Sequence, residues 1–458
     1  MRAKTAAICV LALWAAACTE RELPLEGQRL DVRAPVGEDA EGGEAPLDGT
    51  APVAEAPVAP DPVLVAGTRN VPVSLPGAVA NADWTQAGGG PAHRAGNLAL
   101  GPSLTRVWTA DAGAGDSRRA RIAADPVVAA GRVYTVDSQG RVTATATSGA
   151  TVWQTDVTPA TERPGENTGN GLAYGDGRLF VTTGFGELVA LDAATGRIAW
   201  RQGFNTAVGG APAYADGTVY VVARDASGVA VRAEDGKIQW VLPGTPSDGG
   251  VPGAAAPAVA DGRVFMPYAG GELIAVNAAD GAPQWAAYVA GKRLGRAFAQ
   301  VSDLTGDPVV AGGTVLAGSS AGRLVAFDAE TGTRYWAADE GASDGMVVAG
   351  DAVWFVSDEN QLVRLDAATG DVVWRIDMPY FEKQKDKKRE AIFVQYGPVL
   401  AGGRLITASS DGVLRAFDPA SGALLAASEI PGGAASSPVV AGQTLYVMSR
   451  NGQLHAFR

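Results

Sequence analysis

Hydrophobic and polar positions follow one repeating pattern from about residue 104 to the end of the chain. A short apolar run, a glycine-containing turn and a second apolar run recur eight times; the copy at 126–136 reads PVVAAGRVYTV. Two apolar runs joined by such a turn predict a β-hairpin. A further turn and a third apolar run follow each hairpin, and a fourth run follows in every copy except the last. Four short antiparallel strands in each copy predict one blade of a β-propeller.

The turn before the fourth strand is the most regular part of the pattern. It reads LDAATG at 191–196 and again at 365–370, and the strand after it contains a tryptophan. We expect Gly196 and Gly370 to supply the positive φ that closes the turn, and the tryptophans to fill the space between neighbouring blades. Successive tryptophans stand 38 to 51 residues apart, a spacing typical of propeller repeats. The tryptophans that follow the pattern are Trp108, Trp153, Trp200, Trp240, Trp285, Trp336 and Trp374.

The two ends of the repeat region complement each other. The last copy stops at Arg458 after its third strand, while the segment LTRVWTADA at 104–112 carries Trp108 with no hairpin in front of it. This segment can supply the missing fourth strand, and closing the ring removes two open sheet edges. We therefore predict an all-β fold over 104–458. It is an eight-bladed β-propeller of four-stranded antiparallel blades, closed by an N-terminal strand that completes the last blade.

The beginning of the chain has the composition of an export signal. Arg2 and Lys4 precede a short apolar run, and small residues lead into Cys18. Such a segment is too short to span a membrane and is typical of a signal peptide. The small residues before Cys18 resemble the bacterial lipobox, in which the cysteine is lipidated and becomes the first residue of the mature chain. The resemblance implies a signal peptide over 1–17 and a lipid anchor on Cys18. The alternative is an ordinary cleaved signal with an incidental cysteine.

Two further segments separate Cys18 from the repeats. Residues 19–61 contain eleven acidic residues, three arginines and no aromatic residue. A stretch of this composition cannot bury enough apolar area to fold, so we expect a disordered acidic tether over 18–80. The Gly-rich segment 81–103, which contains Trp84 and His93, is expected to pack across a face of the propeller.

The composition excludes several kinds of chemistry. The formal net charge of −12 argues against a nucleic-acid partner, because phosphate binding requires clustered lysine and arginine. His93 and His455 are the only histidines, and the only cysteines, Cys9 and Cys18, lie in or next to the signal. We find no spacing typical of a metal site, no nucleophile motif and no phosphate-binding loop. The sequence therefore predicts no catalytic residue, no metal site and no bound cofactor.

Function on a propeller is expected in loops that depart from the repeat, because the strands are occupied by packing. The connections at 241–256, 286–307 and 378–397 are irregular. The connection at 378–397 contains a basic cluster. This cluster is either part of a solvated loop or a docking surface for a partner. Its candidate residues are Lys383, Lys385, Lys387 and Lys388.

The repeated pattern A-x-D-x-x-T-G-x-x-x-W resembles the tryptophan docking motif of the pyrroloquinoline quinone (PQQ) propellers, over essentially all of 104–458. Two branches share this motif: the quinoprotein alcohol dehydrogenases, and the propeller lipoprotein of the outer-membrane β-barrel assembly machinery, BamB. Many of the dehydrogenases carry a vicinal disulfide beside the quinone, and the mature chain has no cysteine pair to form one. The lipobox, the acidic tether, the length and the degenerate repeats resemble the BamB branch.

This resemblance implies a function. It implies a non-catalytic scaffold of the assembly complex, anchored in the outer membrane and facing the periplasm, and monomeric within a hetero-complex. The implied partners are the periplasmic domains of the barrel-assembly channel protein and nascent outer-membrane proteins. The implied contact positions are Val251, Pro252, Asp303 and Thr305. Two alternatives stay open: a PQQ-dependent periplasmic dehydrogenase, and a generic periplasmic propeller that binds another protein or a polysaccharide.

Overall fold

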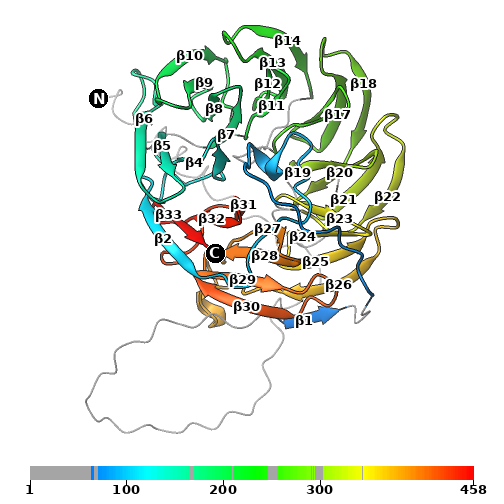
Figure 1. The fold of residues 1–458 in the computed structure, drawn as a ribbon. Helices are drawn as coiled ribbons and strands as arrows, with labels where there is room; N and C mark the ends of the chain where they lie inside the picture. The colour runs from blue at the N-terminus through cyan, green and yellow to red at the C-terminus, as the bar shows by residue number, and fades with distance from the viewer. Residues whose placement is uncertain are drawn as a thin grey trace, which may run out of the picture. The chain divides into compact units, whose positions relative to one another are not determined.

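Eight antiparallel sheets surround a common axis in the computed structural model (Figure 1). The structure describes residues 63–66 (backbone only), 71–163, 165, 169–208, 210–245, 255–289, 291, 293, 303–342 and 344–458. Within each sheet the strand that comes first in the blade lies nearest the axis, and the fourth lies at the periphery. The fold is thus an eight-bladed β-propeller, as the repeat pattern predicts.

The blades follow one another in chain order. Blades 1 to 4 are β3 (Val127–Ala129) to β6 (Thr151–Asp156), β7 (Asn170–Gly175) to β10 (Ile198–Gly203), β11 (Ala213–Ala215) to β14 (Ile238–Pro243), and β15 (Ala258–Ala260) to β18 (Pro283–Tyr288). Blades 5 to 7 are β19 (Leu304–Ala311) to β22 (Arg334–Ala338), β23 (Val347–Ala349) to β26 (Val372–Asp377), and β27 (Gln395–Ala401) to β30 (Leu424–Glu429). Blade 8 consists of β31 (Val439–Ala441), β32 (Thr444–Met448), β33 (Gln453–Phe457) and β2 (Arg106–Asp111).

Blade 8 closes the ring with strands from both ends of the repeat region. Strand β2 pairs antiparallel with β33, and Trp108 lies opposite Ala456. The expectation that the N-terminal strand completes the last blade is therefore confirmed.

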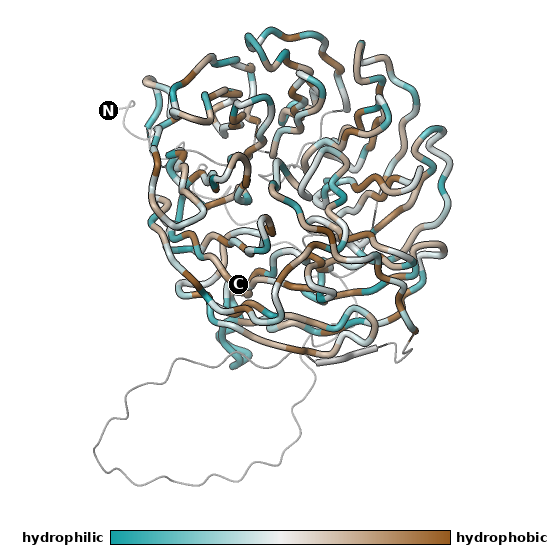
Figure 2. Tube along the Cα trace, in the orientation of Figure 1, coloured by the Kyte–Doolittle hydropathy of each residue, from teal (hydrophilic) through white to brown (hydrophobic). Residues whose placement is uncertain are grey.

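Burial explains why the inner strands are almost uniformly apolar and the outer strands alternate. The second strand of blade 3, β12 (Thr218–Val222), is buried along its whole length, because the neighbouring blades cover both of its faces. The outer strand β14 alternates between exposed and half-buried residues. Figure 2 shows hydrophobic positions along the strands inside the ring and more hydrophilic ones at the outer turns.

Each repeat tryptophan joins its blade to the next one. The Trp153 indole Nε1 donates a hydrogen bond to the Ala193 carbonyl of blade 2 at 3.1 Å. Gly196, in the same turn, has φ of 74°, and a Cβ at this position would lie 2.5 Å from the Trp153 ring. The remaining indoles bond in the same way to the blade that follows: Trp108 to Thr147, Trp200 to Ala233, Trp240 to Ala278, Trp285 to Ala329, Trp336 to Ala367 and Trp374 to Ala420. Blade 7 has Ala426 at this position, so no such bond links it to blade 8.

The Gly-rich lead-in runs inside the ring rather than across a face (Figure 1). Its backbone exchanges two hydrogen bonds with β3, at 2.7 and 2.8 Å between Trp84 and Val128. Backbone bonds also join it to the innermost strands of blades 2, 4, 5 and 7 and to Gly442, directly after β31 of blade 8. The Gln86 side chain accepts from Tyr214 of blade 3. The innermost strands have unpaired edges facing the axis, and the lead-in satisfies them. The expected packing on a face is therefore replaced by packing at the centre.

One segment adds to the periphery of the ring. Strand β1 (Val63–Ala66) pairs antiparallel with β26 and makes blade 6 a five-stranded sheet. The outer edge of a blade therefore accepts a strand even though the ring itself is closed.

Helical structure is minor in the described part of the chain. Two one-turn 3-10 helices, η1 (Ala87–Gly89) and η3 (Asp386–Lys388), are described there. None of the helices among these residues has the length and hydropathy needed to cross a membrane.

Candidate functional site

A well of about 370 Å³ lies where the blade-to-blade connections reach the ring axis. Each blade contributes residues at or just before its innermost strand, and Gln86 and Ala87 of the lead-in complete the wall. Every wall segment comes from a different repeat, so no single stretch of sequence encodes the well.

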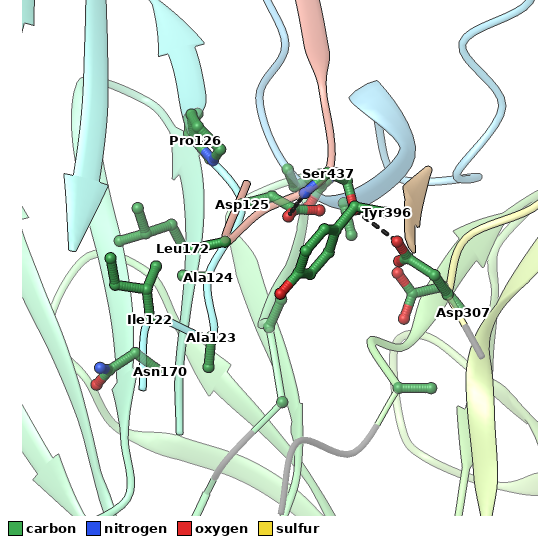
Figure 3. Close-up of a pocket in the computed structure, with 18 of the residues that line it drawn as sticks. Ile122, Ala123, Ala124, Asp125, Pro126, Asn170, Leu172, Asp307, Tyr396 and Ser437 are labelled. Carbon is green, nitrogen blue, oxygen red and sulfur yellow. Dashed lines mark hydrogen bonds between the residues drawn. The ribbon is translucent and has the colours of Figure 1, made fainter. Parts of the chain in front are cut away.

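Three half-buried aspartates give the well its chemistry. Asp125 accepts a hydrogen bond from the Ser437 backbone at 2.7 Å, and Figure 3 shows the Tyr396 ring between Asp125 and Asp307. Asp344 accepts from the Ser437 hydroxyl at 2.6 Å and from the Gly397 backbone at 2.9 Å. Asp307 accepts from the Ala256 backbone at 2.7 Å. Each carboxylate thus connects its own blade to a neighbouring blade.

Burial and the negative charge of Asp344 make Asp125 and Asp307 reluctant to ionise. Burial, followed by the negative charge of Asp344, raises the pKa of Asp125 to about 7. Burial also raises the pKa of Asp307 to about 7, and the charge of Asp344 adds to the effect. Lysine and arginine do not occur among the described residues that line this well. The site is therefore strongly acidic and lacks a basic partner in its described wall.

His93 of the lead-in faces the same carboxylates from a smaller adjoining cavity. The charged and imidazole side chains that line this cavity, of about 50 Å³, are His93, Arg94, Asp125, Asp307 and Asp344. The imidazole Nδ1 lies 2.8 Å from the Pro308 carbonyl oxygen, which can only accept, so Nδ1 carries the proton. The other nitrogen, Nε2, is buried without a hydrogen-bond partner. Burial lowers the pKa of His93 to about 4, so the ring is neutral near pH 7.

The predicted contact residues Asp303 and Thr305 lie at the start of blade 5. Asp303 is only 6% exposed, and its carboxylate accepts from the Gly270 backbone at 3.0 Å. The Thr305 hydroxyl donates to the Ala342 carbonyl at 2.7 Å, and Thr305 also lines the well. Both residues thus hold neighbouring blades together, and their role in partner binding stays a prediction. Val251, Pro252 and Cys18 lie outside the described residues.

The predicted basic cluster occupies an exposed loop between β26 and β27. Lys383, Lys385, Lys387 and Lys388 are all exposed. The loop is braced from within, because the Arg389 guanidinium lies 4.9 Å from the centre of the Phe381 ring. Arg389 also pairs with Asp386 at 2.7 Å. The lysines therefore project from a supported surface and not from an unstructured connection.

Sequence reasoning missed the three aspartates of the well. The signal was present: Asp125 and Asp307 each stand directly before the proline that opens a hairpin, in the identical stretch DPVV. Ser437 and Gly397 occupy the corresponding place in blades 8 and 7. Because this position faces the axis in these blades, an acidic residue there indicates an acidic centre.

These features define the class of protein: an eight-bladed propeller of PQQ-like repeats with tryptophan contacts between blades. The chain belongs to the family of the outer membrane protein assembly factor BamB, whose sequence profile matches residues 138–376 and 381–458. No curated protein matches the chain.

Solved structures from two functional groups share the fold. BamB from Moraxella catarrhalis matches with a TM-score of 0.61 and 22% identity, over 78% of this chain and 98% of that one. The quinohemoprotein alcohol dehydrogenase from Comamonas testosteroni matches with a TM-score of 0.61 and 16% identity, over 83% of this chain and 81% of that one. A europium-containing methanol dehydrogenase matches with a TM-score of 0.60 and 15% identity, over 80% of this chain and 89% of that one. At these identities the matches establish the fold alone.

The described well does not fit a quinone of the PQQ type. PQQ is a tricarboxylic acid, so a site that binds it must offset negative charge. The described wall presents Asp125, Asp307 and Asp344 and no basic side chain. Burying further carboxylates among these groups would add repulsion in a weakly solvated space.

Proposed function

We propose that this chain is a non-catalytic scaffold lipoprotein of the outer-membrane β-barrel assembly complex. Cys18 carries the lipid anchor, the propeller faces the periplasm, and exposed loops bind the periplasmic domains of the channel protein. The observation that carries the proposal is the match of the BamB family profile to 138–376 and 381–458.

The acidic well supports a non-catalytic role. The dehydrogenases that share the fold are the reason to consider a PQQ enzyme, and the described wall has the wrong charge for that cofactor. We therefore expect purified protein mixed with PQQ and Ca²⁺ to give no dye reduction with primary alcohols. Measurable turnover would instead favour the dehydrogenase alternative.

The pairing seen at the outer edge of blade 6 supports a mode of client binding by strand addition. Strand β1 pairs with β26 through backbone registers that do not depend on particular side chains. Nascent outer-membrane proteins are rich in strands, and a free blade edge can pair with them in the same way. We propose that outer blade edges hold such strands temporarily during assembly.

Co-purification tests the proposed function. We expect the full-length chain, expressed in its own cells, to be retained with the channel protein after detergent extraction of outer membranes. Cys18→Ala should reduce the retained amount, since it removes the anchor. Absence of the wild-type chain from the purified complex would contradict the proposal.

A further inference from the structure

The outer strand of blade 6 is more buried than its counterparts in other blades. Three residues of β26 are buried: Val373, Trp374 and Ile376. The outer strands of blades 1, 2, 3, 4 and 7 contain no buried residue. Among the described strands, only β1 adds a fifth strand to a blade, and Figure 1 shows it alongside β26 at the periphery. The edge of blade 6 thus combines an added strand with a buried outer strand.

The two faces of β26 differ in polarity. Trp374 and Ile376 lie on one face and belong to the apolar core between blades. Arg375 and Asp377 lie on the other face and are hydrogen-bonded to polar side chains. A strand added to this edge extends both faces, because successive residues of a strand point to opposite sides of a sheet. The edge therefore suits a chain that alternates apolar and polar residues.

Strand β1 covers only part of this edge. Its register partners are residues 375–377, and its register slips between Leu64 and Ala66. The pairing ends before residues 372–374, the other half of β26. A longer strand can pair along the whole of β26 and gain backbone hydrogen bonds that β1 does not make. A longer strand therefore has the means to replace β1.

The chain that follows β1 is fixed to blade 6 by a buried arginine. Arg364 is 1% exposed, and its guanidinium donates to the carbonyls of Val71 at 2.6 Å and Pro72 at 3.2 Å. The corresponding residue of every other blade is alanine: Ala144, Ala190, Ala230, Ala275, Ala326, Ala416 and Ala456. This attachment is thus particular to the blade that β1 covers. When β1 leaves the edge, the attachment keeps it close by, at high effective concentration.

We propose that the outer edge of blade 6 binds an extended strand of alternating apolar and polar residues, and that β1 guards this edge until such a strand replaces it. The inference rests on the proposed function for the source of the strand, an unfolded outer-membrane β-barrel protein, whose spanning strands alternate in this way. Strand addition uses backbone hydrogen bonds for affinity and alternate side chains for specificity. The guard strand protects an open edge from unproductive pairing.

A disulfide between β1 and β26 tests the guard. Val63 and Asp377 are register partners, and residues 19–458 contain no cysteine that would compete. The full-length Val63→Cys/Asp377→Cys protein would be titrated, oxidised and reduced, into a fluorescein-labelled peptide of about ten residues that alternates threonine and valine between terminal lysines. We expect the oxidised form to bind at least about tenfold more weakly by fluorescence anisotropy, because β1 cannot leave the edge. Equal affinity of the two forms would overturn the proposal.

A second variant removes the guard. Replacing residues 63–66 by Gly-Ser-Gly-Ser keeps the chain length and lowers strand propensity. This variant should bind the peptide at least about threefold more tightly than wild type, because β1 no longer competes. Unchanged affinity would contradict the guard role. The controls are the single variants Val63→Cys and Asp377→Cys, whose affinity should not respond to oxidation, and a peptide with two central prolines, which should not bind.

These results are separate from the test of the assembly role. Co-purification with the channel protein reports the docking loops, and the peptide titrations report the edge of blade 6. A chain that is present in the complex but shows the same peptide affinity in every form would overturn the strand exchange alone.

Discussion

Glycine and tryptophan form the smallest functional unit of this ring. The tryptophan of one blade lies against the glycine of the next blade's turn, and its indole nitrogen bonds to a carbonyl of the same turn. The glycine is therefore required twice, for its positive φ and for the space that the ring occupies. The glycine of each T-G…W motif therefore contacts the tryptophan of the preceding blade.

Gly196→Ala tests this double requirement. Its φ of 74° and a Cβ only 2.5 Å from the Trp153 ring predict a loss of unfolding free energy. The loss should be about 2–4 kcal/mol, the sum of backbone strain and overpacking. Gly177→Ala is the matched control, because its φ is 72° and its Cβ would meet no atom within 4 Å. It should lose about 1 kcal/mol in urea unfolding. Equal losses in the two variants would contradict the tryptophan contact.

The Asp307 carboxylate of the well makes stability depend on pH. The pKa of Asp307 is about 7 in the folded chain against 3.8 for the unperturbed group, so the folded state binds its proton more tightly. This contribution to stability is present below about pH 4 and is lost as the pH rises through 7.

Asp307→Asn should remove this dependence. Unfolding free energy measured in denaturant should improve relative to wild type as the pH rises from about 5 to about 8, because the variant never ionises. The difference between variant and wild type isolates this group from other titrations. A difference that stays constant over this range would show that Asp307 ionises freely in the folded protein.

At the scale of elements, the lead-in and the basic loop form the surfaces that the repeated strands and turns do not provide. The lead-in occupies the inner edges of seven blades, and the basic loop rises from the ring on a base of Phe381 and Arg389. The lead-in thus pairs with the strand edges that face the axis, and the basic loop adds an exposed surface on the exterior of the ring.

The basic loop is predicted to bind an acidic surface of a partner. Replacing Lys383, Lys385, Lys387 and Lys388 by glutamate reverses four exposed charges without removing a core contact. We expect at least about a tenfold loss of affinity for the purified periplasmic domains of the channel protein, and unchanged thermal stability. A double control, Arg197→Glu with Lys237→Glu on exposed turns, should leave affinity within about twofold. Unchanged affinity in the lysine variant would identify the loop as merely solvated.

The strands were predictable because each is encoded locally, by two apolar runs and the turn between them. The lead-in was harder, because its backbone and the Gln86 side chain bond to seven different blades and no local periodicity records such pairing. For the same reason, the sequence did not predict that Asp125, Asp307 and Asp344 share one well. Each is an ordinary residue in its own repeat, and only ring closure brings them together. Asp303 was expected as a contact residue from the family resemblance alone; sequence could not show that its carboxylate accepts a hydrogen bond from the Gly270 backbone, and its contact role stays a prediction.

At the scale of the whole molecule, the closed ring separates two kinds of surface. The axis is acidic and enclosed by the lead-in, and the exterior offers loops and the blade edge that β1 already uses. This arrangement suits a scaffold that binds proteins on its outside.

The most direct test of the scaffold role is the composition of the assembly complex. The channel protein would be isolated from detergent-extracted outer membranes of the native cells, and its associated chains quantified by mass spectrometry. We predict that this propeller is present in a fixed ratio to the channel protein, and that the four-lysine variant is depleted while the Asp344→Asn variant is retained. A complex that contains the channel protein and lacks this chain would contradict the account.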